Sequence, residues 1–224
     1  MTALREIGEI GISDSREGGK DYLLRPSFEA MTRIGEPHEI VEIYADIHGR
    51  EAEKLISVCA DAFGGLPDWM GPAMRRVSDR LLAKAMDVLQ ACSGEDLTPI
   101  IGQWDEVEGK LSYSPGLMPQ SDIVIFAQHL LQHGVTGKAK TRKLQRHESS
   151  GGTTEFNAIE YINAARIHFS ISLDEARFLT MTEFQALLSE KYPDQKGLTK
   201  EEYSAVADDF LAKQAARRAQ ASQK

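Results

Sequence analysis

The chain has 224 residues, of which 42% are apolar and 27% are charged, an ordinary composition for a globular protein with a hydrophobic core. The formal net charge of −8 argues against general binding to nucleic acids or anionic membranes. No segment approaches the roughly 18 uninterrupted apolar residues of a transmembrane helix, and no secretory signal is expected. Two lone cysteines, Cys59 and Cys92, exclude a disulfide framework and fit a reducing cytoplasm, where we expect both thiols to be buried.

Residues 4–26 are predicted to form a β-hairpin. Ile10 and Ile12 precede a polar turn segment that includes Gly18 and Gly19, and a second apolar run begins at Tyr22. Because two strands alone are only marginally stable in water, this hairpin has to pack on other elements.

Residues 27–135 show the periodicity of helices. Pro37 suits a first helical position, and Gly35 and Gly49 each follow an apolar stripe. The segment 123–131 is apolar on most sides, so we place it in the middle of the core. The predicted helices cover residues 28–34, 37–47, 55–63, 74–92 and 123–131, with a further helical segment over 97–107.

A change in composition divides the chain. Residues 136–154 hold five basic residues against one acidic residue, a net charge of +4, and their lack of apolar periodicity is typical of a flexible linker. Residues 155–224 include capping boxes that start at Ser172, Thr180 and Thr199 and predict a small C-terminal three-helix unit with a frayed tail. The predicted fold is therefore mainly α. It has an N-terminal domain of residues 1–135 with the hairpin packed on helices, a basic flexible linker, and the small helical unit.

The motifs of catalysis and metal binding are incomplete in this sequence. His129 and His133 share a helical face in HLLQH, but Leu130 replaces the glutamate of the HExxH zinc motif and no third ligand stands out. The sequence GGKD at 18–21 lacks the serine or threonine that follows the lysine of a phosphate-binding loop. Since a GxSxG nucleophile elbow is also missing, we expect no catalytic residue, no metal and no cofactor.

Three short motifs lie within the segment 158–188. They are ARIHF at 165–169, SLDEA at 172–176 and LTMTEF at 179–184. Together they resemble the C-terminal part of the tail assembly chaperones of tailed bacteriophages. The N-terminal 135 residues, with WMGP at 69–72 and PQSDI at 119–123, resemble uncharacterised phage proteins encoded among tail genes.

This resemblance implies a role without catalysis. Such chaperones bind the tape-measure protein, a very long helical chain, and keep it soluble while the major tail-tube protein is recruited around it. They act in the host bacterial cytoplasm and are not kept in the finished virion. Two alternatives stay open: a virion structural tail or head–tail connector protein, and an enzyme whose site the sequence does not reveal. A flexible basic tether fits the extensive symmetric interface of a structural subunit poorly.

The predicted C-terminal unit is rich in aromatic residues and methionine. We expect Phe178 and Met181 to flank a partner-binding patch that includes Phe169 and Phe184, because a three-helix unit buries only part of such surface. The alternative is that these residues, with Phe210, form the core of the unit.

Limited trypsin digestion tests the predicted linker. We expect the first cleavages between Lys138 and Arg146, because the peptide bonds of a flexible segment reach the protease before those of folded units. Mass spectrometry should then identify two protected fragments. Uniform protection of this stretch would show that it is packed and that the predicted boundary is misplaced.

Overall fold

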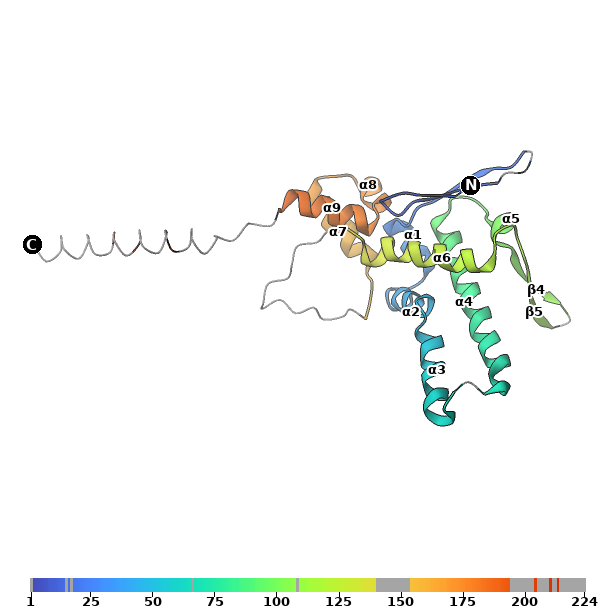
Figure 1. Ribbon diagram of the computed structural model, residues 1–224. Helices are drawn as coiled ribbons and strands as arrows, with labels where there is room; N and C mark the ends of the chain where they lie inside the picture. Colours follow the sequence, from blue (N-terminus) through green and yellow to red (C-terminus); the bar gives the residue numbers. More distant parts are fainter. Residues whose placement is uncertain are drawn as a thin grey trace, which may run out of the picture. The chain divides into compact units, whose positions relative to one another are not determined.

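The computed structural model describes residues 2–14, 16, 18–65, 67–107, 109–139 and 154–193, together with the single residues 204, 210 and 213. Contacts divide the chain into a compact unit, Met1–Lys191, and a second segment, Tyr192–Lys224. The elements named below all belong to the first unit, which is mainly helical, as the sequence predicts (Figure 1). No helix in the described part of the chain is long and apolar enough to cross a membrane.

The helices begin and end at the signals present in the sequence. The Ser27 side chain caps the first helix by accepting a hydrogen bond from the Ala30 N–H, and Pro37 is the first residue of the second. In chain order the helices are α1 (Phe28–Ile34), α2 (Pro37–Ile47), α3 (Arg50–Phe63), the 3-10 helix η1 (Asp68–Met70), α4 (Gly71–Cys92), α5 (Thr98–Ile101), α6 (Gln120–Leu131), the π-helical turn η2 (Gln132–Thr136), α7 (Ala158–Phe169), α8 (Leu173–Phe178) and α9 (Met181–Lys191).

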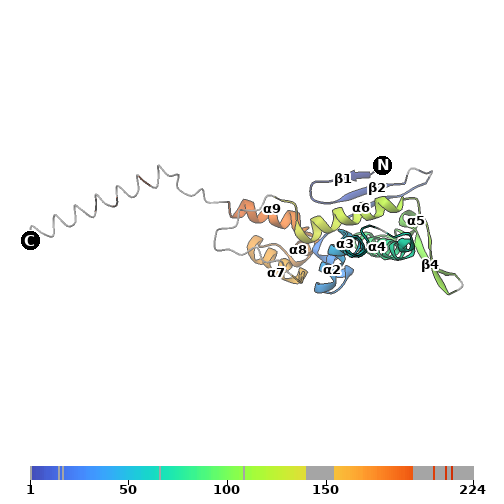
Figure 2. The same ribbon diagram turned by 60° about the horizontal axis from the view of Figure 1, so that its bottom comes forward.

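The predicted N-terminal hairpin is confirmed and carries a third strand. β2 (Ile10–Ser13) and β3 (Asp21–Leu24) pair in antiparallel fashion, and β1 (Thr2–Leu4) pairs with the other edge of β2. Ile10 and Leu24 lie opposite each other and are fully buried, so one face of the sheet packs on the helices. Figure 2 shows the strands beside α6, on the side away from α2 and α4.

The centre of the unit is the packing of α4 along α6. Leu89 of α4 is fully buried, as are Ile123, Leu130 and Leu131 of α6. The expectation that segment 123–131 lies in the core is therefore confirmed for one face of α6, whereas Ile125 on another face is 56% exposed. Burial of four large aliphatic side chains at one helix pair contributes on the order of 1.5–3 kcal/mol for each residue.

The helix predicted over residues 97–107 is wrong beyond its first turn. Only α5 is helical, and a second hairpin follows, formed by β4 (Gln103–Val107) and β5 (Lys110–Ser114). Gly102 ends the helix with a positive φ of 79°, at a point where any Cβ would collide with the carbonyl oxygen of Ser114. Trp104 then pairs across the hairpin with Tyr113, so its apolar surface is covered by a strand partner.

The helices after residue 157 pack on α1 through a cluster of aromatic rings. The fully buried ring of Phe28 lies 5.7 Å from that of Tyr161 and 6.0 Å from that of Phe184. Phe156 stacks on Tyr161 at 5.2 Å, and Phe169 meets Phe184 at 5.8 Å. These contacts join the two ends of the unit into one core.

The division of the chain therefore differs from the predicted one. The sequence predicts a boundary over residues 136–154, whereas α7, α8 and α9 belong to the same compact unit as the N-terminal helices. Even the start of the predicted linker is held, because the Lys138 N–H donates a 3.1 Å hydrogen bond to Thr182 Oγ1. Residues 140–153, the centre of that linker, and the predicted last helix with its capping box at Thr199 lie outside the described residues.

Arg25 fixes the end of β3 to the C-terminal helices. Its guanidinium donates to both carboxylate oxygens of Glu183 at 2.7 and 2.8 Å, and its Nε donates to the carbonyl oxygen of Phe178 at 2.8 Å. It also forms an ion pair with the buried carboxylate of Glu9. Because Glu183 in turn accepts the Thr180 N–H of a capping box, one charged cluster connects the sheet to α8 and α9.

Replacing Phe184 tests whether the unit has one core. Phe184→Ala should lower the free energy of unfolding by about 3–5 kcal/mol, since it removes a buried ring that contacts Phe28, Tyr161 and Phe169. Urea unfolding followed by circular dichroism and by tryptophan fluorescence should show one transition that shifts equally in both signals.

Phe178→Ala is the matched control, because the Phe178 side chain is 56% exposed and its loss should change stability by less than about 1 kcal/mol. Two separate transitions in the Phe184 variant, with the tryptophan signal unshifted, would indicate independent units.

Candidate functional site

The structure separates the residues of the predicted partner-binding patch. Met181 is 3% exposed, Phe184 is buried and Phe169 is half-buried, so these three belong to the core around Phe28. Phe178 is the exception, because its ring faces solvent at the end of α8. The aromatic density of this region therefore serves packing, and the alternative of a core applies to three of the four predicted residues.

His129 and His133 lie together, as their spacing predicts, with ring centroids 4.6 Å apart. His133 is buried and shares a 2.8 Å hydrogen bond with Thr182 Oγ1. Burial, followed by the nearby His129 and Lys138, lowers the pKa of His133 to about 4. The pair thus acts as a neutral contact between η2 and α9, and within the described residues no group of three or more His, Cys, Asp or Glu side chains is placed to hold a metal.

The cysteines occupy the positions expected of them. Cys59 and Cys92 are free and buried, and burial raises the pKa of the Cys92 thiol to about 12. A thiol with so high a pKa is a poor nucleophile, so its role is that of a small apolar side chain.

Several exposed apolar residues gather on an arm formed by α3, η1 and the first half of α4, which projects from the other helices (Figure 1). On α3 only Cys59 is buried, whereas Val58 is 56% exposed and Phe63 is 61% exposed. On α4 burial begins at Val77 and becomes dense from Leu82, where the helix enters the main core. The arm therefore covers little of its own apolar surface.

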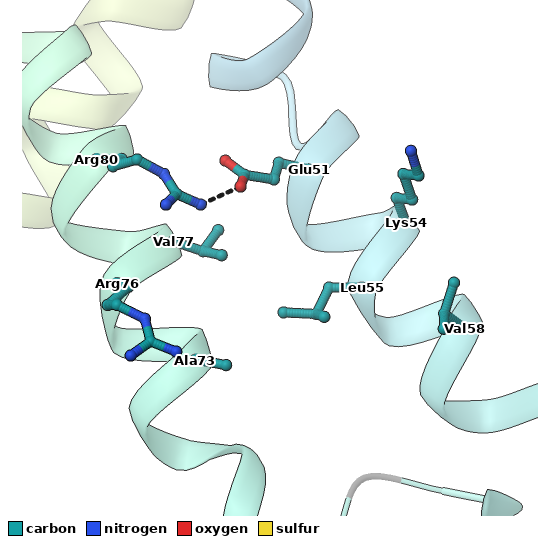
Figure 3. A pocket seen from close by; sticks show the side chains of 8 residues that line it. All are labelled: Glu51, Lys54, Leu55, Val58, Ala73, Arg76, Val77 and Arg80. Carbon is teal, nitrogen blue, oxygen red and sulfur yellow. Dashed lines mark hydrogen bonds and ion pairs between the residues drawn. The ribbon is translucent and has the colours of Figure 1, made fainter. Parts of the chain in front are cut away.

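An open groove of about 470 Å³ runs between the two helices of the arm. Figure 3 shows Leu55 directed from α3 toward α4, and Ala73 and Val77 directed back toward α3. With Val58 these side chains give the groove an apolar floor. Charged side chains stand around this floor, and they are Glu51, Lys54, Arg76 and Arg80.

An ion cluster fixes the base of the arm. Asp46 of α2 accepts hydrogen bonds from Lys84 Nζ at 2.5 Å and from Arg50 Nη2 at 2.8 Å, which joins α2, α3 and α4. Partial burial raises the pKa of Asp46, but the hydrogen bonds from Lys84 and Arg50 outweigh this effect and hold the pKa below its ordinary value. Glu51 and Arg80 form a further ion pair across the groove (Figure 3).

The tip of the arm presents two aromatic rings to solvent. Phe63 ends α3, and Trp69 lies in η1, where 64% of its surface is exposed. The two rings meet edge to face with centroids 5.7 Å apart. Aromatic side chains in such positions bury a large area when a partner covers them, and they are enriched among the residues that dominate binding energy.

Periodicity in the sequence could not identify this groove. The stripe of apolar residues over 55–63 predicts a helix with a buried face, and the helix is confirmed. The chain that follows α3 decides which element covers that face. η1 turns the chain so that α4 runs back beside α3, and a groove remains between the two helices. The sequence does contain one indication of an exposed aromatic residue, because the WMGP motif at 69–72 follows closely on the glycines at 64 and 65 and so places a tryptophan in a loop.

Comparison with protein families places the chain in one of them. Residues 24–205 match a family of unknown function, DUF6246, and because this match spans more than half of the chain, the chain belongs to that family. No curated protein and no solved structure matches. The matched range includes the arm and the aromatic cluster around Phe28.

The buried histidine predicts a pH dependence of stability. The unfolded chain binds a proton at His133 near pH 6.5, whereas the folded chain resists it until about pH 4, so stability is lost as the pH falls through this window. Urea unfolding between pH 7 and pH 4 should show a smaller loss for His133→Gln than for the wild type.

Carboxylates also titrate in this pH range, but they are the same in the wild type and in His133→Gln. Their contribution therefore cancels when the pH dependence of the two unfolding free energies is compared. His38→Gln changes an exposed histidine and is the control. Equal slopes for His133→Gln and the wild type would contradict the assignment of a depressed pKa to His133.

Proposed function

We propose that this protein is a non-catalytic phage tail assembly chaperone that binds a helical client through the groove of its arm. The client is the tape-measure protein, to which the chaperone recruits subunits of the major tail-tube protein. It acts in the host bacterial cytoplasm and leaves before the virion is complete. The observation that carries this proposal is the open apolar groove on a projecting arm, next to two exposed aromatic rings.

The dimensions of the arm suit a helical client. α3 has 14 residues and so extends about 21 Å, which matches roughly four turns of a partner helix lying beside it. Amphipathic helices bind proteins by placing their apolar edge in such a groove. The floor formed by Leu55, Val58 and Val77 offers that edge a contact surface.

The resemblance to tail assembly chaperones supports the proposal in another way. Its motifs lie in α7, α8 and α9, where Glu183 caps α9 and binds Arg25, and where Phe184 fills the aromatic cluster. These motif residues build the body that holds the arm. A shared body with a separate contact surface accounts for the burial of Thr180, Met181 and Phe184 in the last of these motifs.

Binding assays with two double variants test the groove. Val58→Gln with Phe63→Gln should weaken pull-down of the tape-measure protein at least about ten-fold, because the apolar surface of the arm is lost. Ile159→Gln with Ile167→Gln is the matched control, since both side chains are exposed on α7, outside the groove. Circular dichroism should show unchanged folding in both variants.

If the wild type and both double variants bind the tape-measure protein equally, the groove is not the site at which the client binds. Mass spectrometry of purified virions then distinguishes the chaperone from the alternative of a structural tail or head–tail connector protein. Absence from the virion supports the chaperone, and stoichiometric presence supports the structural role.

A further inference from the structure

The charged residues that line the groove differ in whether they form an ion pair. The carboxylate of Glu51 is already paired with Arg80. Among the residues that the structure describes, the recorded ion pairs include neither Lys54 nor Arg76, and both side chains are exposed. The groove therefore presents two cations without a recorded ion pair, within a chain whose net charge is −8.

The two cations come from opposite walls. Lys54 belongs to α3 and Arg76 belongs to α4, and the apolar floor lies between these helices (Figure 3). Each wall of the groove thus carries one cation, with Lys54 at the outer edge of α3. Ala73 is the smallest side chain of the lining, and it leaves space on the α4 wall next to Arg76.

We propose that the groove selects an amphipathic α-helix that carries Glu or Asp on both flanks of its apolar edge. This inference rests on the proposed function and specifies the chemistry of the client. The apolar edge supplies the affinity by covering Leu55, Val58 and Val77, while the acidic flanks pair with Lys54 and Arg76 and fix the orientation of the helix. A small anion such as phosphate would meet the cations but leave the apolar floor exposed to water.

Two designed peptides of about 18 residues test the selection, since this length gives roughly five helical turns. They share one apolar edge of Leu and Ala, and they carry Glu or Lys at the same flanking positions. Fluorescence anisotropy with the full-length protein at low salt should show at least about ten-fold tighter binding of the Glu peptide. The difference should shrink as salt is added, because exposed charges are screened.

Charge reversal identifies the residues responsible. Lys54→Glu with Arg76→Glu should reverse the preference, so that the Lys peptide binds more tightly. Arg166→Glu with Arg177→Glu is the matched control, because it changes the net charge equally at exposed positions of α7 and α8. This control should keep the preference for the Glu peptide. Thermal unfolding of both variants checks that they are folded.

The outcomes separate this inference from the proposed function. Equal binding of both peptides by the wild type, reduced by Val58→Gln with Phe63→Gln, would overturn the charge selection and keep the groove as a helix site. A preference that survives charge reversal at Lys54 and Arg76 would also overturn it. If neither peptide binds, both the acidic helix and the use of the groove by a helical client are overturned.

Discussion

The structure depends on the burial of Phe28. This residue opens a helix of only seven residues, which is too short to be stable in water without tertiary contacts. Its ring is covered by Tyr161 and Phe184, which lie on helices far along the chain, and Phe156 and Phe169 extend the same cluster. Because α1 also contacts α2 and α4, it connects the helices before residue 93 to those after residue 157. The ion cluster of Arg25 then fixes the N-terminal sheet to α8 and α9, and so opposes a shift of the sheet relative to these helices.

Much of the fold could be predicted from local signals. Proline, glycine and side-chain caps act within a few residues, so the ends of α1 and α2, the last residue of α3 and the capping boxes at Ser172 and Thr180 could be read directly from the sequence, whereas the predicted start of α3 lies five residues after the observed start at Arg50. The β4–β5 hairpin could not be predicted in this way, because the spacing of its apolar residues fits both a helix and a strand. The choice between them depends on a tertiary contact, since any Cβ at Gly102 would collide with the carbonyl oxygen of Ser114. The single core was also missed, since aromatic residues separated by more than a hundred positions carry no local sign that they meet.

The groove of the arm could not be predicted from local signals either. Apolar periodicity reports which face of a helix avoids water, and on α4 that inference holds from Leu82 onward. On α3 the corresponding face is covered only in part, since Cys59 is buried whereas Val58 and Phe63 are exposed, so much of the same pattern marks a surface. The base of the arm is held by Asp46, Lys84 and Arg50, and its tip by one pair of rings. Firm attachment at one end and an uncovered apolar face along its length are properties of a contact surface carried on a rigid support.

The distance in sequence between Phe28 and its partners has a consequence during synthesis on the ribosome. Phe156 follows Phe28 by more than 120 residues, so α1 leaves the ribosome long before the rings that cover it exist. At a synthesis rate of about 5–20 residues per second this interval lasts on the order of ten seconds. During that time the apolar faces of α1 and of the N-terminal sheet stay exposed to the cell, and α7 and α9 complete the core only as the last part of the chain emerges. Nascent chains that end before α9 therefore expose apolar surface that general chaperones of the cell can bind.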